Sequence, residues 1–259
     1  MTKLSLSELQ EIAKKVRWDV IDMIYSSQTG HPGGSLSATE ILVALYFEVM
    51  GTQDHFFLSN GHVCPALYAV MAEKGLISKE KLATYATLGS ELQGHPERTK
   101  LKGIENTSGP LGLGLAQAAG YAAIKKDSYI YCMTSDGEHD EGNHWEAVNF
   151  AAKYKLNNLI QFLDKNNIQI EGTTDEIMPL GNLKEKYIAS NWNVIEIDGH
   201  NFDAILNAVE KAKENKGSST VIIANTTFGK GVSFMEGNPD WHAKAPNKEE
   251  FEKAMEELK

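Results

Sequence analysis

Three apolar runs constrain the fold of this chain more than any other feature. They are "SYIYCMT" (128–134), "NLIQFLD" (158–164) and "STVIIANT" (219–226), and each is apolar at mostly consecutive positions. Such runs predict strands buried on both faces, which is typical of parallel sheets covered by helices. Two shorter runs, "HFFLS" (55–59) and "NVIEID" (193–198), predict further strands.

Segments with helical character separate these runs. Apolar residues recur at helical spacing from Leu9 to Ile24, and Ser37 with Glu40 forms a capping-box pattern that predicts a helix start after the "HPGG" turn. Further helices are expected over 65–75, 111–126, 145–154, 183–189, 202–213 and 247–259. Strands that alternate with helices predict an α/β fold, a mostly parallel sheet with helices on both faces. Ligands of such sheets bind beyond the carboxyl ends of the strands.

Composition narrows the class of protein. With no repeat, low-complexity tract or linker, residues 1–259 are expected to form a single domain. A net charge of −10 argues against nucleic acid as a partner, because phosphate backbones require clustered Lys and Arg. Two cysteines give no disulfide framework, and no run of about eighteen apolar residues exists. We expect a cytoplasmic protein with no membrane span.

A polar constellation follows two of the predicted strands. Asp136 comes directly after the strand at 128–134, and Asn166 follows the strand at 158–164. The carboxyl ends of neighbouring parallel strands lie at the same edge of the sheet, so both side chains should meet there. Carboxylate and amide oxygens suit Mg²⁺ or Ca²⁺ and do not suit zinc. Gly137 allows close approach of the backbone to an anionic ligand.

These residues carry a resemblance to a known family. "SDGEHDEG" through "DKNNIQIEG" resembles the thiamine diphosphate motif, and "GHPGGSLSATEIL", "LSNGHVCPALYAV", "GHPE", "NTSGPLGLGLAQAAGYA", "IDGHNF" and "GKGVSFMEGNPDWHAKAP" resemble transketolase. The resemblance covers nearly the whole chain, in family order. It implies the thiamine diphosphate-binding fold, with the metal held by Asp136, Asn166 and the Ile168 carbonyl. Mg²⁺ is the expected metal, with Ca²⁺ or Mn²⁺ possible.

Ser135 departs from the motif, which usually has glycine at that position. Because serine is small and donates a hydrogen bond, we expect the site to survive the change. By the resemblance, Gly137 meets the diphosphate. The "SGPLG" segment packs on the cofactor through Gly109 and Leu111.

Four loop histidines match the family: His31 in "GHPGG", which predicts an irregular turn, His62, His95 and His242. Imidazoles suit a reaction that moves protons on and off hydroxyl groups near neutral pH. The resemblance assigns all four to catalysis. His31 and His242 would handle the hydroxyl whose proton is lost, His95 the first hydroxyl of the donor, and His62 the diphosphate side. His62, Asn166 and His242 would also contact the cofactor. Structural roles are expected for the others: His55, His139, His144 and His200.

The acidic residues divide into groups. By the resemblance, Glu141 and Glu146 lie toward a subunit interface, where buried acids can share protons between active sites, although a solvated helix start is a rival for Glu146. Glu138 and Asp140 are expected to be ordinary first-turn acids of a helix. Glu91 stands where many transketolases have a basic residue, and an acid at the mouth would repel a sugar phosphate.

The family has two further domains, a pyrimidine domain with a catalytic glutamate and a C-terminal domain, and no segment of this chain matches them. The chain therefore resembles the diphosphate-binding half of transketolase, with the other domains expected on a separate chain in an α₂β₂ heterotetramer. The implied activity is transfer of a two-carbon ketol unit between sugars or sugar phosphates, as in the pentose phosphate pathway. The chain alone is expected to be inactive.

Of three alternatives, two stay open at this point. One is a component of another thiamine diphosphate enzyme, such as a deoxyxylulose-phosphate synthase or a 2-oxo-acid dehydrogenase α subunit. A second is a non-catalytic module that binds the cofactor. A third, a nucleotide-binding oxidoreductase suggested by "GPLGLG", fails because no strand leads directly into that segment.

Overall fold

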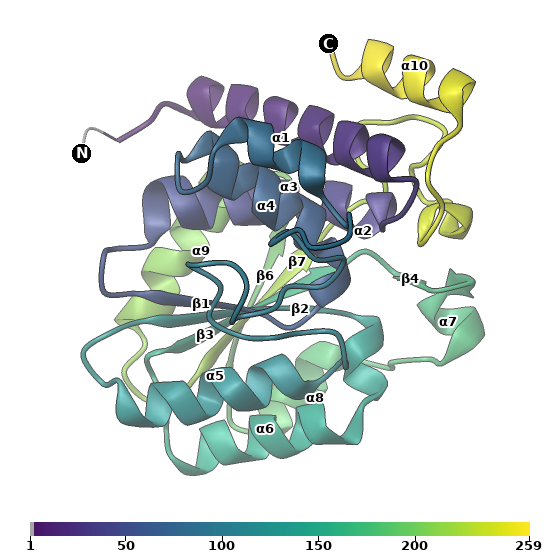
Figure 1. Cartoon of the computed structure of the whole chain (residues 1–259). Helices are drawn as coiled ribbons and strands as arrows, with labels where there is room; N and C mark the ends of the chain where they lie inside the picture. The colour runs from purple at the N-terminus through teal and green to yellow at the C-terminus, as the bar shows by residue number, and fades with distance from the viewer. Residues whose placement is uncertain (1–2) are drawn as a thin grey trace.

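A five-stranded parallel sheet forms the centre of the protein (Figure 1). The computed structural model describes residues 3–259. The strand order is β1-β2-β3-β7-β6. The strands are β1 His55–Leu58, β2 Ile130–Ser135, β3 Leu159–Lys165, β6 Asn193–Asp198 and β7 Thr220–Asn225. β2 is buried along its whole length, and β3 and β7 along all but their last residue, as their apolar runs predict, whereas the edge strand β6 is half-exposed.

Helices cover both faces of the sheet, which confirms the predicted α/β architecture (Figure 1). On one face lie α1 Leu6–Ser27, α3 Thr39–Ala44, α4 Cys64–Glu73 and α9 Phe202–Glu214. On the other lie α5 Leu113–Ile124, α6 Gly142–Lys153 and α8 Leu183–Ala189. The C-terminal helix α10, Lys248–Glu257, packs on α1, where Tyr25 and Phe251 stack with ring centroids 4.0 Å apart.

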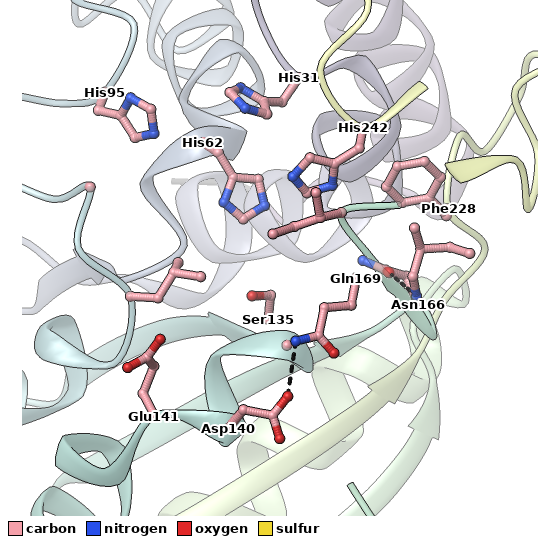
Figure 2. Close-up of a pocket in the computed structure, with 15 residues that line it drawn as sticks. His31, His62, His95, Ser135, Asp140, Glu141, Asn166, Gln169, Phe228 and His242 are labelled. Carbon is pink, nitrogen blue, oxygen red and sulfur yellow. Dashed lines mark hydrogen bonds between the residues drawn. The ribbon is translucent and has the colours of Figure 1, made fainter. Parts of the chain in front are cut away.

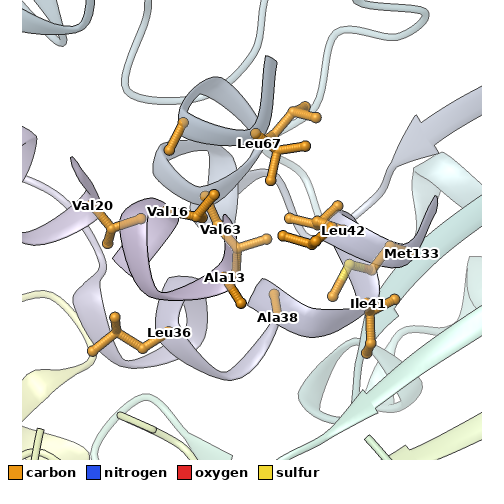
Figure 3. Close-up of a cluster of buried hydrophobic side chains, with 14 of the residues drawn as sticks. Ala13, Val16, Val20, Leu36, Ala38, Ile41, Leu42, Val63, Leu67 and Met133 are labelled. Carbon is orange, nitrogen blue, oxygen red and sulfur yellow. The ribbon is translucent and has the colours of Figure 1, made fainter. Parts of the chain in front are cut away.

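Each face of the sheet has its own apolar core. Figure 3 shows the larger one, in which Val16 of α1 and Leu42 of α3 lie in the same buried cluster as Met133 of β2. All three side chains are fully buried. Burying a side chain of this size contributes roughly 1.5–3 kcal/mol. The two cores hold the sheet rigid, so its edge is a fixed platform for the loops beyond it.

The register of the strands sets the position of the site. Ser135 of β2 lies opposite Asp164 of β3, and Lys165 lies opposite Asn225 of β7. The chain therefore leaves β2, β3 and β7 at the same edge, and Asp136 and Asn166 follow there as predicted.

The segment after His31 differs from the prediction. Helix α2, Pro32–Ser37, begins at the proline, and α3 follows it at once. "HPGG" is thus a helix start instead of an irregular turn, because proline at the first position is preset for a helix. The predicted capping box is also wrong. Ser37 donates to Asp164 instead, and Glu40 binds Arg17.

Several short elements complete the chain. A hairpin of β4 Ile168–Gln169 and β5 Gly172–Thr173, followed by α7 Thr174–Ile177, was not predicted. The 3₁₀ turns are η2 Gly61–Val63, η3 Lys79–Thr84, η4 Gly137–Asp140 and η5 Pro239–Trp241, and η1 Leu45–Val49 is a π-helical turn. Both cysteines are buried free thiols. Among residues 3–259, no helix combines the length and the apolar character needed to cross a membrane.

Candidate functional site

A cavity of about 270 Å³ opens beyond the carboxyl ends of the strands (Figure 2). This is the place where parallel α/β sheets bind ligands. Its walls come from loops that are far apart in the sequence. The lining residues are His31, His62, His95, Gly109, Leu111, Ser135, Gly137, Asp140, Glu141, Asn166, Ile168, Gln169, Ile170, Phe228 and His242.

Four histidines converge on one wall of this cavity. His31 precedes α2, His62 lies in η2, His95 lies on the loop before α5, and His242 follows η5. Their rings gather around His31, whose centroid lies 5.4 Å from those of His62 and His242 and 5.8 Å from that of His95 (Figure 2). The four histidines singled out in the sequence therefore share one site.

Partial burial disfavours the charged form of these imidazoles. It lowers the pKa of His31 to about 4, helped by the neighbouring His242 and His95. Burial also lowers the pKa values of His62, His95 and His242 below their ordinary value. The Nδ1 atom of His31 is buried and makes no hydrogen bond within residues 3–259. A neutral imidazole with an unpaired nitrogen can accept a proton or a hydrogen bond from a hydroxyl group.

The predicted ligands Asp136 and Asn166 follow the ends of β2 and β3. Asp136 is 1 % exposed, and its Oδ1 and Oδ2 accept hydrogen bonds from the backbone N–H groups of Gly137 (2.9 Å) and Asn167 (2.5 Å). Burial, with the nearby Asp164, raises the pKa of Asp136 to about 7. Two adjacent buried carboxyl groups are a setting that a bound cation stabilises. Asp136 lies behind Gly137 and does not itself line the cavity.

Asn166 and Ile168 complete this side of the site. Asn166 donates from Nδ2 to Asp164 (3.0 Å), which turns its amide oxygen toward the backbone N–H of Ile168 (3.0 Å). Together with Asp136 they offer one carboxylate, one amide oxygen and one carbonyl, hard oxygen donors of the kind Mg²⁺ binds. No group of three or more His, Cys, Asp or Glu within the described chain is arranged for a metal. The donor set therefore fits Mg²⁺ or Ca²⁺ and does not fit zinc.

Asp164 holds the Asn166 side chain, a role that was not predicted from the sequence. The Asp164 carboxyl is fully buried and accepts hydrogen bonds from Ser37 (2.6 Å), Asn166 (3.0 Å) and Thr226. Burial raises its pKa, and these hydrogen bonds oppose the rise. The only signal in the sequence was an acid two positions before Asn166 at the end of an apolar run.

Glu138 lies in the first turn of η4, as predicted, but it is fully buried and so is not an ordinary helix-start acid. Its carboxyl accepts hydrogen bonds from Ser59 and from the N–H groups of Gly112 (2.8 Å) and Ser135 (3.1 Å). Burial raises its pKa to about 7 against these hydrogen bonds. Glu138 thus ties the ends of β1 and β2 to the loop whose Gly109 and Leu111 line the cavity.

The other acids of this stretch are exposed. Asp140 accepts a hydrogen bond from Nε2 of Gln169 (2.9 Å), and both residues line the cavity (Figure 2). Glu141 stands at the N-cap position of α6 without a side-chain capping hydrogen bond and also lines the cavity, and Glu146 is exposed on α6. Glu91 does not line the cavity and pairs with Lys81 at 2.5 Å. A cation therefore accompanies the acid that was expected to repel phosphate.

The remaining histidines lie outside the cavity lining. His139 and His144 each make a hydrogen bond to the Tyr187 hydroxyl, at 2.9 and 2.8 Å, within the core. His55 pairs with Glu105, and His200 pairs with Glu40.

Comparison with known proteins identifies the family. Residues 8–258 match the family model described as "Transketolase, thiamine diphosphate binding domain".

The chain belongs to the transketolase family.

Its relatives include transketolase subunits of about its own length. It is 40 % identical to one of the subunits of apulose-4-phosphate transketolase from Actinobacillus succinogenes, over 99 % of this chain and 98 % of the relative. It is 42 % identical to 6-deoxy-6-sulfo-D-fructose transketolase subunit SqwG of Clostridium sp. strain MSTE9, over 97 % of this chain and 96 % of the relative.

Solved transketolases share the fold. Leishmania mexicana transketolase superposes with a TM-score of 0.92 at 29 % identity, over 99 % of this chain and 42 % of that one. Campylobacter jejuni transketolase gives 0.91 at 33 % identity, over 98 % and 43 %. The chain thus spans less than half the length of these longer enzymes.

Proposed function

We propose that this chain is the diphosphate-binding subunit of a split transketolase, which transfers a two-carbon ketol unit from a ketose to an aldose. The observation that carries the proposal is the cavity itself. Four neutral histidines and a set of hard oxygen donors for a metal lie together around it. The relatives of equal length are named transketolase subunits.

Thiamine diphosphate, held through a divalent cation, supplies the carbon nucleophile of such a transfer. In this chain Asp136, Asn166 and the Ile168 carbonyl would hold the cation, for which we propose Mg²⁺. Gly137 offers its backbone beside the same cavity, where an added Cβ would come within 3.2 Å of Gln169. His62, Gly109, Leu111 and His242 are proposed as further cofactor contacts, since all four line the cavity.

The histidines are proposed to handle the protons of the sugar hydroxyls. His31 has a buried, unpaired Nδ1, and His242 lies beside it, so a hydroxyl placed between them has a neutral base within reach. The His95 ring lies 5.8 Å from that of His31 between centroids, and His95 would hold a second hydroxyl of the donor sugar. Burial lowers the pKa of His62 well below its ordinary value, and this histidine would face the diphosphate side.

We propose that the pyrimidine domain, with its glutamate, and the C-terminal domain belong to a partner chain in an α₂β₂ assembly, with residues 1–259 as the diphosphate-binding domain. This agrees with relatives of equal length whose names make each of them one subunit of a transketolase. Glu141 and Glu146 are exposed near the cavity and on α6, and are proposed to face another protein chain of the assembly. Glu141→Gln and Glu146→Gln should weaken assembly or activity. Full activity with intact assembly in both variants rules out this role.

The class of sugar substrate is proposed from the names of the relatives and from the position of the Lys81–Glu91 pair. The relatives' names specify a sugar phosphate in one case and a sulfonated sugar in another, so the anionic group varies among them. The Lys81–Glu91 pair places both charges outside the cavity, and we propose that this chain does not select for phosphate through Glu91. A cytoplasmic location and a place among pentose phosphate reactions complete the proposal.

Ketol transfer by the chain mixed with its partner tests this function. His31→Asn should lower kcat by on the order of 100-fold, because a positioned acid or base contributes 10²–10⁴-fold. His55→Asn is the matched control, since His55 pairs with Glu105 away from the cavity and should retain activity. Equal activity of both variants would contradict the assignment. A profile of phosphorylated and free acceptors separates transketolase from other thiamine diphosphate enzymes.

A further inference from the structure

His200 does not line the cavity. It lies in a turn that contacts the start of the segment from β7 to His242, and that segment contributes residues to the cavity wall. The turn follows β6, and Gly199 donates its N–H to the Asn225 carbonyl at the end of β7 (2.8 Å). A Cβ at Gly199 would lie 2.4 Å from the Thr226 methyl group, so only glycine allows this approach. The turn therefore holds the backbone at the start of the segment that runs from β7 to His242.

The His200 ring bridges the buried Glu40 and the half-buried Thr227. Its Nε2 accepts a hydrogen bond from the backbone N–H of Thr227 (2.8 Å), and its Nδ1 lies 2.9 Å from Oε2 of Glu40. Because a backbone N–H only donates, Nε2 carries no hydrogen, and Nδ1–H donates to Glu40. The hydrogen bonds thus specify one neutral tautomer of His200.

Glu40 extends the bridge to two helices. Its Oε2 also accepts from Arg17 of α1 (2.6 Å), and Arg17 donates as well to the Leu36 carbonyl in α2 (3.2 Å). Burial raises the pKa of Glu40, but the hydrogen bonds from His200 and Arg17 and the charge of Arg17 outweigh it and leave that pKa below its ordinary value. Glu40 is therefore a carboxylate that holds α1, α2 and the His200 turn together.

The His200–Glu40–Arg17 bridge joins two segments, and each of them lies next to a histidine that lines the cavity. Thr227 leads directly to Phe228, whose ring lies parallel to that of His242 with centroids 6.3 Å apart. Phe228 rests on Gly33 of α2, and the Gly229 N–H donates to the Gly33 carbonyl (3.0 Å). His31 is the N-cap residue of α2.

We propose that His200 is a positioning residue that sets the distance between His31 and His242 through its Nδ1–H···Glu40 and Thr227 N–H···Nε2 hydrogen bonds. It does not line the cavity, and neither Glu40 nor Thr227, the partners of its two ring hydrogen bonds, lines the cavity. The inference rests on the proposed function of the histidine pair, but its structural part is testable without any activity.

Two-bond ¹⁵N–¹H spectra of the histidine rings in the full chain at pH 8 are the test. They should show His200 as the Nδ1–H tautomer; the Nε2–H tautomer would overturn the proposal. In His200→Phe, which keeps a ring but neither hydrogen bond, the ring signals of His31 and His242 should move. In His200→Gln, whose amide offers one donor and one acceptor, they should return toward their original positions.

His55→Phe is the matched control, because it removes another His–Glu pair at the start of β1. It should leave the His31 and His242 signals in place. Unmoved signals in a folded His200→Phe chain, or equal movement in His55→Phe, would overturn the proposal. If His200→Phe does not fold, the tautomer and the His200→Gln spectra still decide.

Kinetics of the reconstituted enzyme then separate positioning from binding. His200→Phe should lower kcat by on the order of 10- to 100-fold, as a displacement of about 1 Å can. His200→Gln should recover most of that loss, and half-saturation by thiamine diphosphate should change less than threefold. A kcat that is unchanged in His200→Phe refutes only the claim that His200 affects catalysis, and the spectra still test its structural role. Absence of activity in the unsubstituted pair refutes the proposed function and leaves the spectra to judge His200.

Discussion

The contact between Gly33 and Phe228 allows the packing of the site to be tested by a single methyl group. A Cβ built at Gly33 would lie 2.1 Å from two Phe228 ring atoms and 2.7 Å from a third. Gly33 has an ordinary helical backbone in α2, so alanine fits the backbone and clashes only with the ring. Gly33→Ala therefore isolates the cost of overpacking between the segment that follows His31 and the segment that leads to His242.

Overpacking a core typically costs about 1–3 kcal/mol. Alanine gains back about 0.5–1 kcal/mol over glycine in a helix, so Gly33→Ala should destabilise the chain by up to about 2.5 kcal/mol. Gly120→Ala is the matched control, because Gly120 lies within α5 and an added Cβ meets nothing within 4 Å. It should stabilise the chain by about 0.5–1 kcal/mol.

Urea unfolding of the two variants and the parent chain measures both values. Adding Phe228→Leu to Gly33→Ala removes the ring that clashes, so the pair should show a favourable coupling of about 1–2 kcal/mol in a double-mutant cycle. If Gly33→Ala and Gly120→Ala change the free energy of unfolding by the same amount, the contact between α2 and the Phe228 segment is not as described.

Three further predictions follow from the buried groups. Asp136→Asn should weaken Mn²⁺ binding by at least on the order of 10- to 100-fold, a loss seen even when a residue behind a metal ligand is replaced. Titration calorimetry with the partner and thiamine diphosphate present measures this affinity, and an unchanged value would exclude Asp136 as a ligand. Glu138→Ala should lower the free energy of unfolding by about 2–5 kcal/mol, because it leaves the Gly112 and Ser135 N–H groups buried and unpaired at about 1–3 kcal/mol each; a loss below 1 kcal/mol would argue against those hydrogen bonds. Since burial lowers the pKa of His31 from 6.5 to about 4, the unfolded chain binds the extra proton between these values, and stability falls as pH drops through that window. The loss between pH 7 and pH 5 should be about 2 kcal/mol smaller in His31→Asn, and an identical pH dependence would contradict a buried neutral His31.

The sheet was predictable because its signal is local. β2, β3 and β7 are buried on both faces, so their apolar runs stand out without knowledge of their neighbours. Helix α2 was not predictable in the same way, since two glycines and a proline in "HPGG" favour a turn. Its glycine at position 33 is explained by Phe228, which lies almost two hundred residues away in the sequence.

Part of the candidate site was also predictable, because its histidines lie in loops with recognisable sequence motifs. His31, His62, His95 and His242 were found from their loops and their resemblance to transketolase, and the structure brings them together. Glu138 was misjudged because an acid at a helix start is normally solvated, and the sequence does not show that Ser59 and Gly112 enclose it. The roles of Asp164 and His200 depend on contacts between distant segments, which no local pattern reveals.

Ketol transfer measured for this chain alone, for its partner alone and for the two mixed tests the central claim most directly. The partner is a chain with a pyrimidine domain and its glutamate, sought in the neighbouring reading frame and by co-purification. With thiamine diphosphate and Mg²⁺, the mixture should turn over and each chain alone should not. Turnover by this chain alone, or none by a complex that binds the cofactor, would contradict the account.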